Sequence, residues 1–81
     1  MIKTVLVDDE QLAREELRFL LEENSTLEVI GEFASGAQAI EEIPALQPDV
    51  IFMDVYLQDM DGLDVIRTLQ QLNVRSSVVF A

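Results

Sequence analysis

The sequence predicts an α/β protein in which a small parallel sheet is covered by helices. Short apolar runs rich in β-branched residues alternate along the chain with longer amphipathic segments, in the order β-α-β-α-β-α-β. Two of these runs, TVLV at residues 4–7 and VIFM at residues 50–53, have no charged side chain and are almost entirely apolar, which is typical of strands buried on both faces. This pattern favours parallel strands joined by right-handed crossovers.

The first half of the chain is expected to contain two strands and two helices. Residues 4–7 are predicted to form a strand and residues 11–23 an amphipathic helix. The inward face of this helix carries Ala13, Leu17, Leu20 and Leu21, and the outward face Arg14, Glu15, Arg18 and Glu22. Residues 27–34 alternate apolar and acidic side chains, which suits an edge strand. Ser35 is expected to cap a short helix, which Pro44 should kink or end near Ile43.

The second half of the chain is expected to contain the remaining strands and one helix. Residues 50–53 are the most uniformly apolar run and therefore the best candidate for a central strand. Asp61 is placed to cap a helix that runs to about Leu72. The residues expected to be buried in this helix are Leu63, Ile66 and Leu69. Asn73 closes the helix, and residues 77–80 begin a fourth strand.

Composition excludes several classes of function. The chain has 81 residues, enough for one small domain, and a net charge of −11 from 16 acidic and 5 basic residues. Direct nucleic-acid binding is not expected without a Lys/Arg surface. The absence of Cys and His rules out disulfides and a typical zinc site. No apolar run is long enough to span a membrane and no signal peptide is evident, so a cytoplasmic location is expected.

The apolar runs at residues 4–7 and 50–53 both end in aspartate. Asp8 and Asp9 follow the first run, and Asp54 follows the second. If the two strands are parallel neighbours, these carboxylates converge at the carboxyl edge of the sheet, where ligands of open α/β sheets bind. Mg²⁺ prefers such oxygen ligands, and a carboxylate beside the metal can accept a phosphoryl group. The alternative is that Asp8 and Asp9 only cap the following helix and Asp54 only ends a strand.

Three motifs carry a resemblance to a known family. VLVDDE at residues 5–10, IFMD at residues 51–54 and MDGL at residues 60–63 together resemble the receiver domain of two-component response regulators. The resemblance runs from Ile2 to Ala81, and LAREEL at residues 12–17 is most similar to regulators of the LytTR type. It implies a flavodoxin-like receiver fold with strand order 2-1-3-4, of which residues 1–81 are the N-terminal portion.

The resemblance also implies a role for each site residue. Asp54 would be the phosphoacceptor, receiving a phosphoryl group from a sensor histidine kinase. Asp9, Asp54 and the backbone carbonyl of Tyr56 would bind Mg²⁺ directly, and Asp8 mainly through water. Tyr56 would also flank the phosphoryl group, although an ordinary loop aromatic is an equal alternative, and Gly62 would allow a tight turn into the following helix. The module would not be an enzyme beyond self-catalysed phosphotransfer, and a LytTR-type parent would carry a separate DNA-binding output domain.

The sequence departs from the family pattern in two places. Gln58 stands where receivers usually have proline, which predicts a less rigid loop. The fifth strand, two further helices and the phosphate-binding hydroxyl and lysine residues have no counterpart, and the only lysine, Lys3, lies at the wrong end of the first strand. We therefore expect a truncated, switch-defective receiver that forms a homo-oligomer through the exposed edge of its fourth strand.

Two other functions remain open from the sequence. One is a natural or engineered assembly fragment in which the acidic pocket is a relic. The other is a Mg²⁺-dependent aspartyl phosphohydrolase. Such enzymes usually have a second carboxylate two residues after the nucleophile. Tyr56 occupies that position after Asp54, and Glu10 occupies it after Asp8. This function ranks last. Arg14 and Arg18 are expected to be solvated, with a kinase-facing surface as the alternative.

Overall fold

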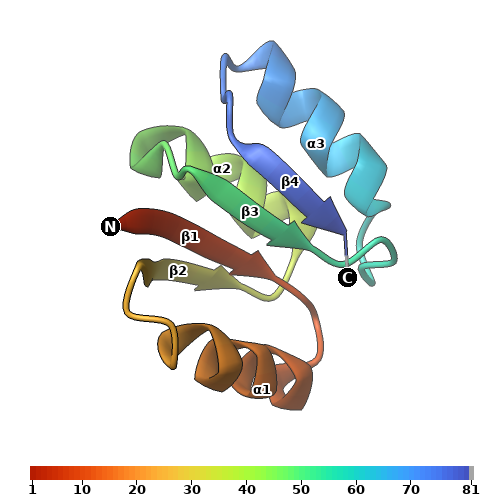
Figure 1. Cartoon of the computed structure of the whole chain (residues 1–81). Coiled ribbons are helices and arrows are strands. Elements are labelled where there is room, and N and C mark those ends of the chain that lie inside the picture. The colour runs from red at the N-terminus through yellow and green to blue at the C-terminus, as the bar shows by residue number, and fades with distance from the viewer. Residues whose placement is uncertain (81) are drawn as a thin grey trace.

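A parallel sheet with helices on both faces forms the whole of the computed structural model, which describes residues 1–80 (Figure 1). Its strands are β1 (Ile2–Val7), β2 (Leu27–Phe33), β3 (Val50–Met53) and β4 (Ser77–Phe80). The helices are α1 (Gln11–Glu22), α2 (Gly36–Leu46) and α3 (Gly62–Gln71). The strand order is β2-β1-β3-β4, and every neighbouring pair is parallel. The predicted fold class, strand order and edge position of β2 are confirmed.

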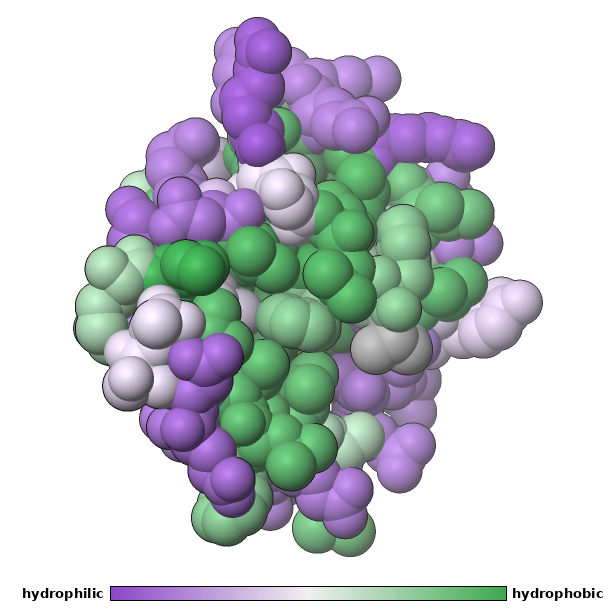
Figure 2. All heavy atoms as spheres, viewed as in Figure 1, coloured by the Kyte–Doolittle hydropathy of each residue, from purple (hydrophilic) through white to green (hydrophobic). Residues whose placement is uncertain are grey.

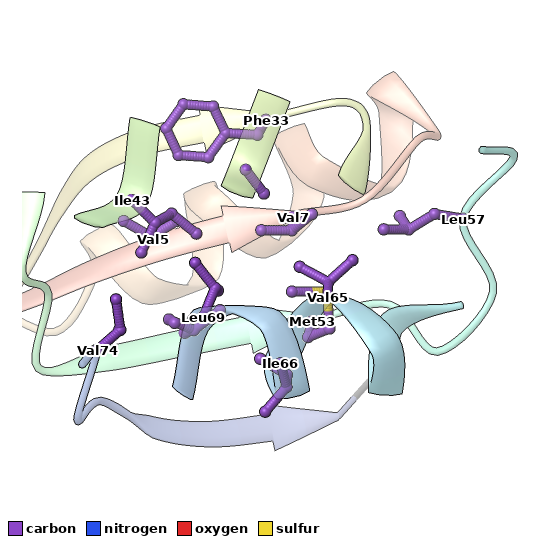
Figure 3. Packing of buried hydrophobic residues seen from close by; sticks show 12 residues of the cluster. Val5, Val7, Phe33, Ile43, Met53, Leu57, Val65, Ile66, Leu69 and Val74 are labelled. Carbon is purple, nitrogen blue, oxygen red and sulfur yellow. The ribbon is translucent and has the colours of Figure 1, made fainter. Parts of the chain in front are cut away.

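The two faces of the sheet are covered unequally. Helices α2 and α3 pack together on one face, and α1 lies on the other, against β1 and β2 (Figure 1). The main core lies under α2 and α3, where Val5 and Val7 of β1 point toward Ile43 and Leu69 (Figure 3). Leu6 is also fully buried but lies outside that cluster, as expected from the alternation of side chains along a strand. Burial on both faces explains why the end of β1, from Val5 to Val7, is apolar.

The α1 face of the sheet carries much exposed apolar surface. Figure 2 shows hydrophobic side chains gathered across the middle of the face that α2 and α3 leave uncovered. Large apolar side chains that are exposed on α1 and β4 are Leu12, Phe19, Leu20, Val79 and Phe80. None of the helices in residues 1–80 is long and apolar enough to cross a membrane.

The rotation of α1 differs from the prediction. Leu20 was expected to face inward but is 65% exposed, whereas Arg14 was expected to face outward and is half-buried. Ala13, Leu17 and Leu21, spaced four residues apart, are the apolar residues that face the sheet. Arg14 reaches across to β2, where it forms an ion pair with Glu32. An inward stripe this narrow leaves no residue of α1 fully buried.

The end of α2 and the buried face of α3 also differ from the prediction. Helix α2 passes through Pro44 to Leu46, and Gln47 ends it in a left-handed conformation at φ 45°. Proline removes one backbone donor, but the Gln47 N–H still donates to the Ile43 carbonyl at 3.1 Å, so the last turn stays closed. In α3, Leu63 is 46% exposed and Val65 is fully buried instead. Helix α3 begins at Gly62, which sets Val65, Ile66 and Leu69 toward the core.

Candidate functional site

Three carboxylates meet at the carboxyl edge of the sheet. Asp8, Asp9 and Asp54 are all half-buried, and one carboxylate oxygen of each lies within 4.8 Å of the others. The register of β1 and β3 pairs Val7 with Met53, which brings the residues that follow these strands side by side. The predicted convergence of the three acids is therefore correct. The cluster lies at the topological switch point of the sheet, because β2 lies on one side of β1 and β3 on the other.

Local hydrogen bonds fix two of these carboxylates. Asp8 Oδ1 accepts from the Glu10 N–H at 2.8 Å, and Asp54 Oδ1 accepts from the Tyr56 N–H at 3.1 Å. Each bond closes a short turn after a strand and uses one oxygen, so Oδ2 of each residue is left for a ligand. The carboxylates are thus oriented before any ligand arrives.

No cation of the described residues neutralises these three charges. Arg14, on α1, donates to the backbone carbonyl of Asp8 at 2.6 Å and forms an ion pair with Glu32 of β2 at 3.7 Å. Arg18 is also paired with Glu32. The prediction of solvated arginines was therefore wrong for Arg14, which ties α1 to β2 and to the end of β1. Neither guanidinium forms an ion pair with the acidic cluster in residues 1–80.

The donor set fits a divalent cation. Three oxygen ligands from carboxylates less than 4.8 Å apart, with a net negative charge left unpaired, match the hard oxygen ligands and open coordination that Mg²⁺ requires. Like charges held this close repel each other, and a cation between them removes that cost.

The loop after β3, residues 54–61, is held against the sheet. Its ends are joined by a bond from the Gly62 N–H to the Val55 carbonyl at 2.7 Å, and Tyr56 forms an isolated antiparallel bridge with Asp61. Gly62 is buried, and a Cβ atom there would collide with the Asp54 carbonyl oxygen and contact Met53 Cγ at 3.0 Å. Glycine is needed for this close approach. A left-handed backbone conformation is not the reason, since no described glycine has a positive φ.

Tyr56 and Lys3 occupy very different positions relative to the acids. The backbone of Tyr56 adjoins Asp54 through the turn hydrogen bond, while its side chain is 80% exposed. Lys3 lies at the opposite end of β1, where its backbone exchanges hydrogen bonds with Asp49. The structure therefore brings together Asp8, Asp9, Asp54 and the Tyr56 backbone, and keeps Lys3 away from them.

One residue of the loop was not predicted. The Asp59 carboxylate accepts the backbone N–H groups of Gly36 and Ala37, each at 2.9 Å, at the start of α2. These bonds, first that from Gly36, hold the pKa of Asp59 below its ordinary value of 3.8. The partners lie 23 and 22 residues earlier in the chain, so no local pattern reveals the contact. Nothing in the sequence distinguishes Asp59 from the other acidic residues, of which the chain has 16 in all.

The fold and the site define an open α/β domain with an acidic pocket at the switch point of its sheet. The family model for the response regulator receiver domain matches residues 4–81. The chain belongs to the response regulator receiver domain family. Receiver domains are signalling modules that accept a phosphoryl group, generally are not enzymes, and bind Mg²⁺ at an acidic pocket.

Curated relatives are regulators much longer than this chain. Sensory transduction protein LytT of Bacillus cereus is 40% identical over 81 residues, which is 100% of this chain and 33% of that protein. Transcriptional regulatory protein BtsR of Escherichia coli K12 is 42% identical over 69 residues, or 85% of this chain and 29% of that protein. The chain thus spans about a third of the length of these relatives.

Solved structures show the same fold. The response regulator domain of Thermotoga maritima CheB has a TM-score of 0.92 and 25% identity, with 99% of this chain and 59% of that chain covered. The signal receiver domain of the putative response regulator NarL from Mycobacterium tuberculosis has a TM-score of 0.91 and 32% identity. In that comparison 98% of this chain and 64% of the other are covered. The α/β architecture is therefore that of a receiver domain.

Proposed function

We propose that Asp54 accepts a phosphoryl group from the phosphohistidine of a sensor histidine kinase. In this proposal Mg²⁺ is held by Asp8, Asp9, Asp54 and the backbone carbonyl of Tyr56, and residues 1–81 are the N-terminal portion of one receiver domain. The observation that carries the proposal is the cluster of three half-buried carboxylates within 4.8 Å with no cation of the described residues paired to them. Membership of the receiver family supports it.

The chemistry required of this chain is a nucleophilic substitution at phosphorus. Asp54 Oδ2 attacks the phosphorus atom, and the P–N bond to the donor imidazole breaks. The imidazole leaves with the electron pair of that bond, and it takes up a proton from water if its other ring nitrogen carries none. The product is an acyl phosphate on Asp54. The bond from the Tyr56 N–H to Asp54 Oδ1 keeps the carboxylate turned so that Oδ2 is free. Bound Mg²⁺ would supply neutralisation of the phosphoryl charge.

For these 81 residues by themselves we propose slow and weak phosphorylation. A second cation near the phosphoryl group lowers the barrier to transfer, and the only lysine, Lys3, lies at the far end of β1 from Asp54. In the described residues, the acids proposed to bind a metal therefore have no lysine beside them.

The test combines a small-molecule phosphodonor with mass spectrometry. The 81-residue chain is incubated with acetyl phosphate and Mg²⁺, and the mass gain of one phosphoryl group is followed over time. We expect a low level of adduct that Asp54→Asn abolishes, while Asp64→Asn, an exposed acid on α3, leaves it unchanged. Adduct that persists in the Asp54→Asn variant would disprove the assignment of the phosphoacceptor. Rapid, complete modification would disprove the proposed impairment alone.

We further propose that the 81-residue chain pairs with a second copy of itself along β4. Natural edge strands are protected by charges and bulges. The β2 edge has both. It carries the charged residues Glu28 and Glu32, and Ile30 forms a β-bulge, because it is an extra residue in the register of β2 with β1. The β4 edge, SVVF at residues 77–80, carries no charged side chain, and Val79 is 43% exposed. This difference favours pairing at β4 and also supports the second candidate function, an assembly module.

The remaining parts of the function concern the whole protein. By analogy with LytT and BtsR, we propose that the parent is a cytoplasmic regulator whose output domain, a DNA-binding one, lies outside these residues. A net charge of −11 argues against nucleic-acid binding by this chain itself. The histidine kinase is then the partner that this domain meets directly.

A further inference from the structure

The start of α2 is held by two side chains from different parts of the chain. Ser35, the residue before the helix, accepts the Gln38 N–H at 3.1 Å through its hydroxyl. Asp59, in the loop after β3, accepts the N–H groups of Gly36 and Ala37, each at 2.9 Å. The first N–H groups of a helix have no partners inside it, so these contacts satisfy three of them. Of these two capping residues, Asp59 is the one that links α2 to the loop that carries the candidate site.

Electrostatics strengthens the link between Asp59 and α2. A carboxylate at a helix N-terminus is stabilised by the free N–H groups and by the helix dipole. The pKa of Asp59 is correspondingly held below its ordinary value, mainly by the bonds from Gly36 and Ala37. The side chain therefore stays ionised at neutral pH and keeps its strong acceptor character.

Packing holds the same part of the loop in place. Gly36 lies against Met60 and Val65, and a Cβ atom at Gly36 would collide with the Met60 side chain and approach Val65 Cγ2 to 2.8 Å. Met60 is the neighbour of Asp59 in the loop. The hydrogen bonds of Asp59 and the contact of Met60 thus hold two neighbouring loop residues against the start of α2.

The other end of the loop contains the proposed metal ligands. Asp54 begins the loop, and the Tyr56 N–H is bonded to its carboxylate. The Tyr56–Asp61 bridge and the bond from the Gly62 N–H to the Val55 carbonyl join the two sides of the loop. These bonds cross the loop and connect the side that carries Asp59 with the backbone of Tyr56. The side chain of Tyr56 itself is exposed and does not anchor the loop.

We propose that Asp59 is a positioning residue for the acidic site. By binding the start of α2, it fixes the path of residues 55–61 and so holds the Tyr56 carbonyl and the Asp54 carboxylate in the geometry that binds Mg²⁺. Asp59 does not touch the metal or the phosphoryl group. This inference rests on the function proposed for Asp54, and it names a residue outside the acidic cluster as a determinant of metal affinity.

The test measures Mg²⁺ affinity and backbone hydrogen exchange in three variants. Tyr56 is the only Tyr in a chain without Trp, so its fluorescence is a specific probe next to Asp54, and calorimetry gives an independent dissociation constant. Asp59→Ala removes both bonds to α2, and Asp59→Asn keeps one carbonyl acceptor. Ser35→Ala is the matched control because it removes a cap from the same helix without touching the loop.

We expect Asp59→Ala to weaken Mg²⁺ binding about tenfold, the lower end of the effect of residues that orient metal ligands. Asp59→Asn should lie between this variant and the unmodified chain, and Ser35→Ala should bind as the unmodified chain does. In Mg²⁺-free buffer, Asp59→Ala should speed amide exchange at Tyr56 and Gly62 as well as at Gly36 and Ala37. Ser35→Ala should speed exchange only around Gln38.

Each contrary result has a distinct meaning. Unchanged Mg²⁺ affinity in Asp59→Ala, or an equal loss in Ser35→Ala, overturns the positioning role and leaves Asp59 as a simple helix cap. If the unmodified chain shows no binding that Asp54→Asn abolishes, the function proposed for Asp54 fails instead. In that case the exchange rates at Tyr56 and Gly62 still decide whether Asp59 holds the loop, because they are measured without metal.

Discussion

The backbone N–H of Asp54 donates to the carbonyl of Val7 at 2.9 Å. Val7 ends β1 and Asp54 follows β3, so this bond continues the ladder between the two central strands by one residue beyond β3. Asp8 comes directly after Val7, and the same ladder therefore places its carboxylate beside that of Asp54. The acidic cluster is a consequence of strand register, and it persists as long as β1 and β3 remain paired.

Neutralising one member of the cluster should have opposite effects with and without metal. Without Mg²⁺, Asp54→Asn should raise the free energy of unfolding by about 1–2 kcal/mol, because two repulsions across less than 5 Å are removed. The asparagine oxygen can still accept the Tyr56 N–H. With millimolar Mg²⁺, the unmodified chain should gain stability by metal binding and the variant much less. Urea unfolding in EDTA and in Mg²⁺ measures both differences.

Asp64→Asn is the control for this prediction, because Asp64 is exposed on α3 and its charge is paired with Arg67. It should respond to Mg²⁺ as the unmodified chain does. A loss of stability for Asp54→Asn in EDTA would show that the three carboxylates do not repel one another as their spacing indicates.

Gly62→Ala should destabilise the fold through the loop next to Asp54. The added Cβ collides with the backbone carbonyl oxygen of Asp54, which cannot move without disturbing the end of β3. We expect a loss of about 2–3 kcal/mol, typical of overpacking at a tight site. Urea unfolding measures the loss.

Gly31→Ala provides the comparison on β2. Its added Cβ would meet side-chain atoms of Phe33 at 3.1 Å and Leu46 at 3.2 Å, and side chains can shift by such small amounts. The loss should be clearly smaller than for Gly62→Ala. Equal losses in the two variants would mean that the contact with the Asp54 carbonyl is not the cause.

Val79→Lys should convert an oligomer of the 81-residue chain into a monomer. A lysine on the β4 edge places a charge where a second strand would have to pair. Leu12→Lys is the matched control, since it makes the same charge change at an exposed apolar residue of α1, away from the edge. Size-exclusion chromatography with light scattering at micromolar concentration gives the mass of each.

Two results would contradict the proposed pairing. A monomeric unmodified chain would remove the basis for self-association, and a monomeric Leu12→Lys with an oligomeric Val79→Lys would move the interface to α1. If neither Mg²⁺ nor the Asp54→Asn substitution changes the mass of the oligomer, the assembly function is favoured over signalling.

The stabilising effect of Asp59 should disappear in acid. Because α2 holds the folded-state pKa of Asp59 below 3.8, the folded chain binds this proton less readily than the unfolded chain does. The contribution of the ionised carboxylate is therefore complete above the ordinary pKa and is lost as the pH falls through the lowered one. The stability difference between the unmodified chain and Asp59→Asn should shrink over that range.

Urea midpoints between neutral pH and about pH 3 test this, since that range includes the unfolded pKa of aspartate. The difference between the unmodified chain and Ser35→Ala should stay constant, because serine does not titrate there. A difference for Asp59→Asn that is equally constant would show that the charge of Asp59 does not stabilise α2.

Much of the fold was predictable because it depends on local patterns. The mainly apolar runs at residues 4–7 and 50–53 identified β1 and β3, and alternation in residues 27–34 identified β2 as an edge strand. Caps were predicted correctly at Ser35 and Asp61, which accept N–H groups two or three residues ahead of them. The rotations of α1 and α3 were partly wrong, because several faces of a short helix are apolar enough to be buried. Packing against the sheet selects one of them, as Val65 in place of Leu63 shows.

The sequence by itself determined that Asp8, Asp9 and Asp54 meet, since parallel neighbouring strands bring their carboxyl ends to the same edge of a sheet. Only the tertiary structure decided what surrounds them. Arg14 binds the Asp8 carbonyl instead of solvent, and Asp59 binds the start of α2 from a loop 22 to 23 residues further along the chain. Strand period and helix period describe neighbours within one element. Contacts between a loop and a distant helix depend on how the elements pack, and no local pattern encodes them.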